Sequence, residues 1–120
     1  MLRIAAILSV FLISMMIQNH EAKAYGALAA NKSSSPWSYA MVYNDSSATR
    51  ARSGALKLCG SGCSTVATFV NKCVATAVGS TGSGWASSSS LGGAKLAALS
   101  ICKKNSPKGC KFDISGCDGK

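Results

Sequence analysis

The phrase Ala-Leu-x-x-Cys occurs twice in this chain, and each copy is followed by a further cysteine, which constrains the fold more than any other feature. The two copies are residues 55–59 and 98–102. Around both, small apolar residues recur at steps of three and four, which is typical of one face of a helix. The sequence therefore predicts two counterpart helices, each with a cysteine in its last turn. The predicted inner faces are Ala48, Ala51, Ala55 and Leu58 in the first helix, and Leu91, Ala94, Ala98 and Ile101 in the second.

Segments with the composition of strands surround each helix. They are residues 25–30, 37–43 and 64–70 in the first half, and residues 73–78, 84–89 and 110–114 in the second. Both halves therefore follow the order strand–strand–helix–strand, which indicates a tandem duplication within one domain. We predict an α+β fold in which the two helices pack on one face of an antiparallel sheet. Chance similarity between two helices rich in small residues is the alternative.

Residues 1–24 have the three parts of a secretory signal peptide. Arg3 gives a basic start, residues 4–17 form an apolar run, and Ala22 and Ala24 supply a small-x-small end. We expect cleavage near Ala24 and one mature domain, residues 25–120, that is periplasmic or fully secreted. A membrane anchor is the alternative, but the run is shorter than the roughly 20 apolar residues that span a bilayer. We therefore expect no transmembrane anchor in the mature form.

All six cysteines fall in the expected mature domain. An even number of cysteines in a small exported domain indicates a disulfide framework. A metal site is the alternative, but the chain has no Cys-x-x-Cys pair, and its one histidine, His20, lies in the expected signal peptide. We expect three disulfides and no metal. The equivalence of the two halves predicts the pairs Cys59–Cys63 and Cys102–Cys110, and leaves Cys73–Cys117.

The expected mature domain has few groups for catalysis. It has no histidine and no glutamate, and its carboxylates are Asp45, Asp113 and Asp118. Asp45 fits a helix cap, Asp113 lies in the last predicted strand, and Asp118 lies in a chain end that we expect to fray. A Ser–His pair is impossible, and a cysteine nucleophile would break the even disulfide set. A Ser–Lys arrangement stays open on composition, but no motif indicates one, so we predict neither an enzyme nor a cofactor.

Positive charge is the strongest functional signal. The whole chain has a formal net charge of +9, and removal of Arg3, Glu21 and Lys23 lowers it to +8. Such a field attracts anions in a salt-dependent way, which predicts an anionic protein or envelope polymer as partner. Nucleic acid is disfavoured because no binding motif accompanies the charge, and solubility alone is the plain alternative. The candidate binding residues are Lys103, Lys104, Lys108 and Lys111 near the chain end, and Arg50 and Arg52 in the first helix.

Aromatic residues form the second functional signal. Trp37, Tyr39 and Tyr43 alternate along one predicted strand and therefore share one face of it. Trp85 occupies the corresponding strand of the second half. Two interpretations stay open: the row packs under the helices, or it forms an exposed ledge that stacks on a sugar or grips a protein.

The motifs together resemble a known family. "YGALAA", "ALKLCGSGC", "NKCVATAVG", "GWASSS" and "AALSIC", followed by two late cysteines, resemble the bacterial proteins that contain domain of unknown function 4189. The resemblance covers essentially the whole expected mature chain. It implies a small exported bacterial protein, with no enzymatic activity and no catalytic residues to transfer.

These observations predict an exported, non-enzymatic binding module. The leading hypothesis is a periplasmic protein-interaction module, inhibitor-like or immunity-like, that neutralises an acidic partner. The alternative is a cationic envelope-binding or antimicrobial protein that acts on anionic glycopolymers or lipids.

Overall fold

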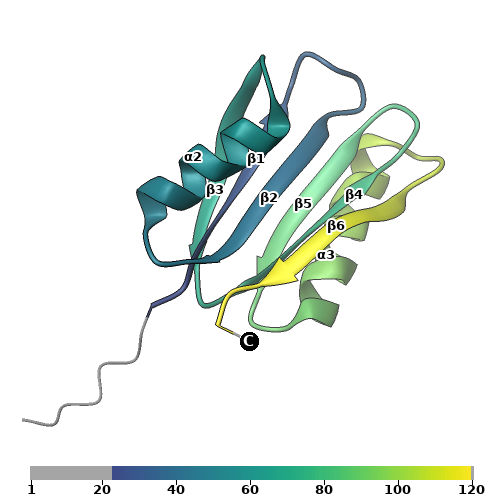
Figure 1. Cartoon of the computed structure of the whole chain (residues 1–120). Coiled ribbons are helices and arrows are strands. Elements are labelled where there is room, and N and C mark those ends of the chain that lie inside the picture. Colours follow the sequence, from purple (N-terminus) through teal and green to yellow (C-terminus); the bar gives the residue numbers. More distant parts are fainter. Residues whose placement is uncertain (1–22, 120) are drawn as a thin grey trace, which may run out of the picture.

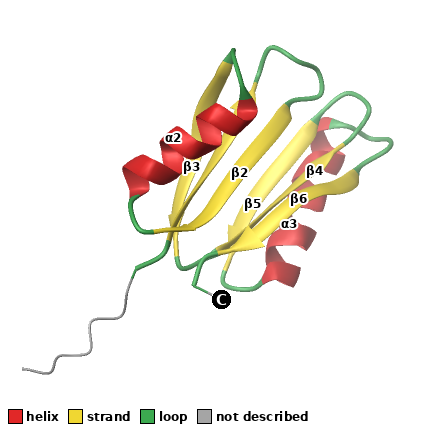
Figure 2. Ribbon diagram, viewed as in Figure 1, coloured by secondary structure: helices red, strands yellow, loops and turns green. Residues whose placement is uncertain are grey.

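The computed structural model describes residues 23–119. The first half consists of β1 (Tyr25–Asn31), β2 (Ser38–Asp45), α2 (Ala48–Cys59) and β3 (Cys63–Val70). The second half consists of β4 (Cys73–Val78), β5 (Ser83–Ser88), α3 (Leu91–Asn105) and β6 (Lys111–Cys117). Both halves have the predicted order strand–strand–helix–strand (Figure 2). The signal-peptide prediction falls on residues 1–24, which lie almost wholly outside the described range.

The six strands form two antiparallel sheets, in the orders β2-β1-β3 and β5-β4-β6. The α+β class is confirmed, but the expected single sheet with both helices on one face is not what forms. Each half supplies its own central strand, β1 or β4, and both neighbours of that strand come from the same half. The hydrogen-bonded ladder is therefore complete within each half, and the second sheet stacks on the first instead of extending it.

The central strand of the first sheet is buried on both faces. Ala27 and Ala29 cluster with Ala51 and Ala55 of α2. Leu28 points to the opposite face, because side chains alternate along a strand, and it packs against the other sheet. The residues between the sheets, which we call the intersheet cluster, are Leu28, Phe69 and Val74, with Tyr39, Met41, Val66, Ala67, Trp85 and Ile114 partly buried against them.

The second half repeats this arrangement. Ala75 and Ala77 of β4 pack with Ala94 and Ala98 of α3, and Val74 enters the intersheet cluster. The molecule is therefore a four-layer sandwich in the order α2, first sheet, second sheet, α3 (Figure 1). The helices cover opposite outer faces because each packs on the sheet of its own half.

The buried face of each helix is narrower than the sequence spacing predicts. The central alanines are fully buried, but Leu58 is 70% exposed, Ile101 39% and Leu91 37%. The backbones of helix and sheet approach closely where only small residues lie between them. At Gly84 of β5, an added Cβ would lie 2.5 Å from the backbone nitrogen of Cys102. The small residues thus set the distance between each helix and its sheet.

Serine N-caps begin both helices. Ser47 Oγ accepts a hydrogen bond from the Arg50 N–H at 3.3 Å, and Ser90 Oγ accepts one from the Gly93 N–H at 3.1 Å. Gly60 ends α2 with a φ of 94°, a conformation that favours glycine. Local signals therefore define where the helices begin and where α2 ends.

Three disulfides join neighbouring elements, and none of the six cysteines is free. Cys59–Cys63 and Cys102–Cys110 each fasten a helix to the strand that follows it. Cys73–Cys117 fastens β6 to β4, where its two cysteines are partners in the ladder. The bonds are Cys59–Cys63, Cys102–Cys110 and Cys73–Cys117, the pairs that the equivalence of the halves predicts.

Candidate binding cleft

A cleft of about 720 Å³ lies where the two halves meet. Residues 32–37 of the β1–β2 loop line one side, and residues 81–85 with Ile101 and Asn105 of α3 line the other. The β1–β2 loop and the β4–β5 loop lie at the same end of the sandwich (Figure 1). The cleft is therefore made jointly by the two halves.

Three of the four predicted aromatic residues line this cleft, namely Trp37, Tyr39 and Trp85. The ring centroids of Trp37 and Tyr39 are 6.4 Å apart, and their planes are tilted by 57°, which agrees with a shared strand face. Tyr39 and Trp85 also pack against the intersheet cluster, so each contacts the core and the cleft at once. The aromatic row therefore lies at the edge of the space between the sheets and not under the helices.

Tyr43 does not join these residues. It is 48% exposed, and its ring lies over Gly116 of β6, where an added Cβ would be 2.7 Å from Tyr43 Cε1. Met41 of the intersheet cluster lies between Tyr39 and Tyr43 along β2. The structure thus divides the predicted row, with one tyrosine outside the cleft.

Tyr39 connects the two halves. Its hydroxyl oxygen lies 2.8 Å from Ser83 Oγ on β5, and the Asn105 side chain donates to the Ser83 carbonyl at 2.8 Å. Burial raises the pKa of the Tyr39 hydroxyl above its ordinary value of 10.0; the hydrogen bond with Ser83 opposes this shift, and the charge of Asp113 adds to it. Tyr39 is therefore a neutral hydroxyl group at physiological pH.

Lys32 is the charged residue of the cleft lining. Its Nζ lies 5.2 Å from the centroid of the Trp37 ring, within the range of cation–π attraction. Asn31 fixes the start of this loop, because its side-chain oxygen accepts the Ser33 N–H at 3.1 Å. No carboxylate is among the residues that line the cleft, so the electrostatic character of the lining is positive.

The four candidate lysines lie on a segment that is fastened to one side of the cleft. The Lys108 carbonyl accepts from the Ser80 N–H at 3.3 Å and from Ser106 Oγ at 2.9 Å. Ser106 is fully buried, and its Oγ accepts the N–H of Thr81, which lines the cleft, at 3.1 Å. This segment therefore flanks the cleft without lining it. Its exposed lysines are Lys103 and Lys104 in the last turn of α3, Lys108 in the α3–β6 loop and Lys111 at the start of β6.

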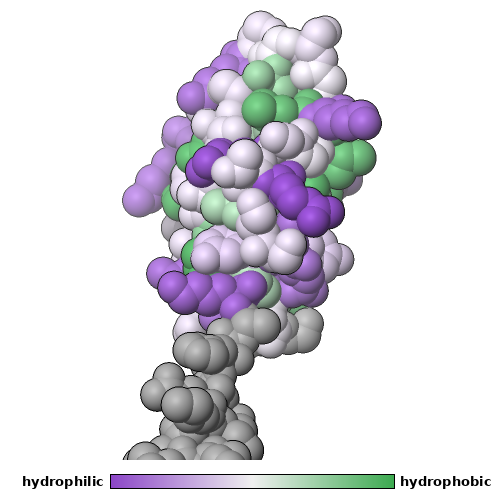
Figure 3. Space-filling model, turned by 60° about the vertical axis from the view of Figure 1, so that its left-hand side comes forward, coloured by the Kyte–Doolittle hydropathy of each residue, from purple (hydrophilic) through white to green (hydrophobic). Residues whose placement is uncertain are grey.

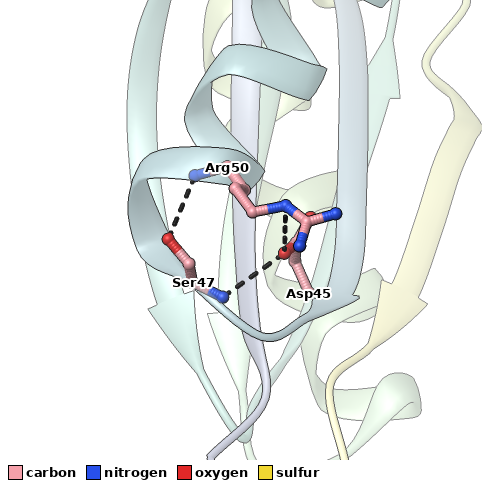
Figure 4. A network of polar contacts seen from close by, with 3 residues as sticks. All are labelled: Asp45, Ser47 and Arg50. Carbon is pink, nitrogen blue, oxygen red and sulfur yellow. Dashed lines mark hydrogen bonds and ion pairs between the residues drawn. The ribbon is translucent and has the colours of Figure 1, made fainter.

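Arg50 and Arg52 lie on α2, in the opposite outer layer of the sandwich. Arg50 Nε is 3.7 Å from Asp45 Oδ1, which also accepts the Ser47 N–H at 3.3 Å (Figure 4). Arg50 therefore belongs to the polar network that begins α2. On the side that carries α2, hydrophilic residues are scattered among apolar ones (Figure 3). The structure thus separates the arginines from the lysines, and the two basic sets do not form one surface.

Asp118 is a residue whose environment the sequence reasoning missed. It is only 1% exposed, so the expected frayed end is wrong. Its Oδ1 accepts the Asn44 N–H at 2.7 Å, whereas its buried Oδ2 has no hydrogen-bond partner within the described residues. Burial raises the pKa of the Asp118 carboxyl, and the bond from Asn44 opposes the shift. The neighbouring Cys73–Cys117 pair was the one sequence signal for an anchored chain end.

The other described carboxylates belong to local contacts. Asp45 lies in the network at the start of α2, and Asp113 accepts from Thr76 Oγ1 at 3.3 Å. Within residues 23–119, no group of three His, Cys, Asp or Glu side chains could hold a metal ion. In the same part of the chain, no helix has the length and apolar character needed to cross a membrane. The groups that line the cleft are suited to stacking, hydrogen bonding and attraction of anions.

One family model, "Domain of unknown function (DUF4189)", matches residues 25–117 of the chain. The match begins at Tyr25, where the mature domain is expected to begin, and it includes both halves and all six cysteines. No curated protein and no solved structure matches the chain. Because the match covers most of the sequence, the chain belongs to the family of domain of unknown function 4189.

Proposed function

We propose that this chain is an exported, non-enzymatic binding module whose ligand is seated in the cleft at Trp37, Tyr39 and Trp85. The convergence of aromatic side chains from both halves on one cleft carries the proposal. Its volume of about 720 Å³ falls in the range of small-ligand sites, roughly 300–1,000 Å³. The cleft therefore suits a compact ligand, or one segment of a polymer, better than the broad surface of a globular protein.

Export and the absence of catalysis are parts of the same proposal. Disulfides such as the three in this fold persist mainly in oxidising compartments outside the cytoplasm. The three described carboxylates each make a structural contact, and none lines the cleft. We therefore prefer an envelope-binding role, in which a cationic protein of the periplasm or cell exterior holds a segment of an anionic glycopolymer.

A protein-interaction role, inhibitor-like or immunity-like, is the second candidate. Leu96 on α3 is 69% exposed and Phe112 on β6 is 52% exposed. Lys95 Nζ lies 5.8 Å from the centroid of the Phe112 ring. Exposed apolar residues beside a lysine suit an acidic protein partner, and this surface belongs to the α3 layer rather than to the cleft.

Capture of envelope components distinguishes the two roles. The mature protein is immobilised and exposed to envelope extract at low salt, beside Trp37→Ala and a Tyr43→Ala control that changes an aromatic residue outside the cleft. We expect Trp37→Ala to lose most of the captured material and Tyr43→Ala to retain it. Undiminished capture by Trp37→Ala would contradict the cleft as the binding site. Loss of a captured protein on Leu96→Ser with Phe112→Ser would favour the second candidate.

A further inference from the structure

We propose that the ligand of the cleft is a carbohydrate chain, with one sugar ring stacked on Trp37 and an acidic group of the sugar, where present, directed to Lys32. This inference rests on the proposed function and assigns the parts of its glycopolymer ligand to individual residues of the cleft. It follows from three features of the cleft: the aromatic rings that line it, the polar groups around them, and the direction in which charge changes across it.

Trp37 provides the stacking surface. Unlike Tyr39 and Trp85, it takes no part in the intersheet cluster, and its ring lines the cleft beside Lys32. The faces of sugar rings carry C–H groups with partial positive charge, and these pack well on the negative face of an aromatic ring. Trp37 and Tyr39, tilted by 57° with centroids 6.4 Å apart, form two adjoining planes. Such planes suit two successive sugar rings that are rotated relative to each other.

Hydroxyl and amide groups surround these rings. Ser34 and Ser35 lie on the loop side, and Thr81, Ser83 and Asn105 lie on the opposite side. Hydroxyl groups both donate and accept hydrogen bonds, as sugar hydroxyls do. Ser83 is already held by Tyr39 and Asn105, so less ordering is needed on binding. Ser34, Thr81 and Asn105 each make a hydrogen bond within the protein as well. A purely apolar ligand would take water away from the donor and acceptor positions that remain, which is costly.

Charge changes in one direction across the cleft. Lys32 lies on the loop side, whereas Ile101 and Asn105 on the other side belong to the C-terminal end of α3. The free carbonyls of a helix C-terminus carry partial negative charge. Lys103 and Lys104 lie in the same last turn but do not line the cleft. Among the groups that line the cleft, an acidic group of the ligand is therefore favoured near Lys32. No arginine and no helix N-terminus lines the cleft, so it lacks the groups that most often bind phosphate, and a nucleotide fits it less well than a sugar.

Intrinsic fluorescence tests the proposal, because both tryptophans of the chain line the cleft. The mature protein is titrated with chitotetraose, a neutral sugar, and with the acidic disaccharide of N-acetylglucosamine and N-acetylmuramic acid. We expect saturable binding of both. Trp37→Ala is expected to weaken both by about tenfold or more. Lys32→Ala is expected to weaken only the acidic sugar, by about threefold to tenfold, and only at low salt. Tyr43→Ala is the control with unchanged affinity.

Calorimetry measures the same affinities without the tryptophan signal, and disulfide mapping checks that each variant has folded. Each variant must show the three native disulfides; Trp37 lies outside the intersheet cluster, so its replacement leaves the core intact. Failure of both sugars to bind at millimolar concentration overturns the proposal, and so does a proline-rich peptide that binds the cleft in their place. If capture of envelope material needs Trp37 but both sugars fail, only the carbohydrate assignment is wrong. If capture does not need Trp37, the proposed function itself is wrong.

Discussion

The carboxyl group of Asp118 is buried in an unfavourable environment, at the end of the molecule opposite the cleft. Its Oδ2 is buried without a hydrogen-bond partner among the described residues, and a Cβ on Gly26 would lie 2.9 Å from this oxygen. Burial of a carboxylate without full pairing disfavours its charged form. The raised pKa of Asp118 is the expected consequence, and it makes the stability of the fold depend on pH.

The raised pKa of Asp118 predicts that this residue lowers the stability of the fold as the pH rises. Folding raises the pKa of Asp118 above its ordinary 3.8, so just above that value the folded chain holds more protons than the unfolded chain. Stability therefore falls as the pH rises from 3.8 through the raised value, and the loss persists above it. Asp118→Asn keeps an acceptor for the Asn44 N–H and removes the charge. We expect the variant to gain stability relative to the native protein as pH rises from 3 to 7, measured by urea unfolding. Parallel curves for the two proteins would contradict this account.

At the scale of elements, contact between helix and sheet backbones depends on Gly84. A Cβ there would lie 2.5 Å from the backbone nitrogen of Cys102 and 2.7 Å from the Ala98 carbonyl oxygen, and neither atom moves without shifting α3. We expect Gly84→Ala to lower the free energy of unfolding by about 1–3 kcal/mol. Gly92, in the first turn of α3, is the matched control because no atom lies within 4 Å of its added Cβ. Gly92→Ala is expected to be neutral or stabilising by up to about 1 kcal/mol. Urea unfolding of the oxidised protein measures both variants, and equal changes in their free energy of unfolding would contradict the close approach of α3 to β5.

The disulfides differ in how much chain they enclose. Cys73–Cys117 spans 44 positions, whereas Cys59–Cys63 spans 4. On the loop-entropy model the longer bond stabilises the fold by about 4 kcal/mol and the shorter by about 2 kcal/mol. Double replacement by alanine of Cys73 and Cys117 should therefore lower the midpoint of urea unfolding more than the same change at Cys59 and Cys63. The reverse order would indicate that local strain or residual structure in the unfolded chain outweighs loop entropy.

At the scale of the whole molecule, the four layers decide which charges act together. The segment that carries Lys103, Lys104, Lys108 and Lys111 is fastened beside the cleft by the hydrogen bonds of Ser106 with Thr81 and with the Lys108 carbonyl. Arg50 and Arg52 lie on α2, in the other outer layer. We expect triple replacement of Lys103, Lys104 and Lys108 by serine to weaken binding of an anionic ligand by about 1–3 kcal/mol, since each basic residue near an anionic surface contributes roughly 1 kcal/mol. Calorimetric titration at low and high salt measures the loss.

The matched control replaces Arg50, Arg52 and Lys57 of α2 by serine, which removes the same charge from the layer that does not flank the cleft. A smaller loss is expected there, with stability nearly unchanged, because the Arg50 side chain is exposed and its contact with the partly buried Asp45, at 3.7 Å, contributes little. Equal losses from both triple variants would show that the net charge acts as a diffuse field. No loss from either would assign the charge to solubility.

Sequence alone determined the features that depend on neighbouring residues. Steps of three and four gave the helices, which the structure forms as Ala48–Cys59 and Leu91–Asn105. The equivalence of the halves gave the two short-range disulfide pairs, since each helix has a cysteine in its last turn close to the next one along the chain; the long-range pair Cys73–Cys117 followed by elimination. These are local relations, and periodicity or short loops are enough to specify them.

Tertiary structure alone decided how the halves meet, because strand alternation tells which residues share a face but not what covers that face. Stacking of two sheets, instead of growth of one, placed α2 and α3 in opposite outer layers. The same stacking put Tyr39 and Trp85 at the cleft edge while Tyr43 came to lie on β6. It also buried Asp118 through a contact with Asn44, a residue 74 positions away. Contacts of this kind arise only when distant strands pair and pack, so no local pattern records them.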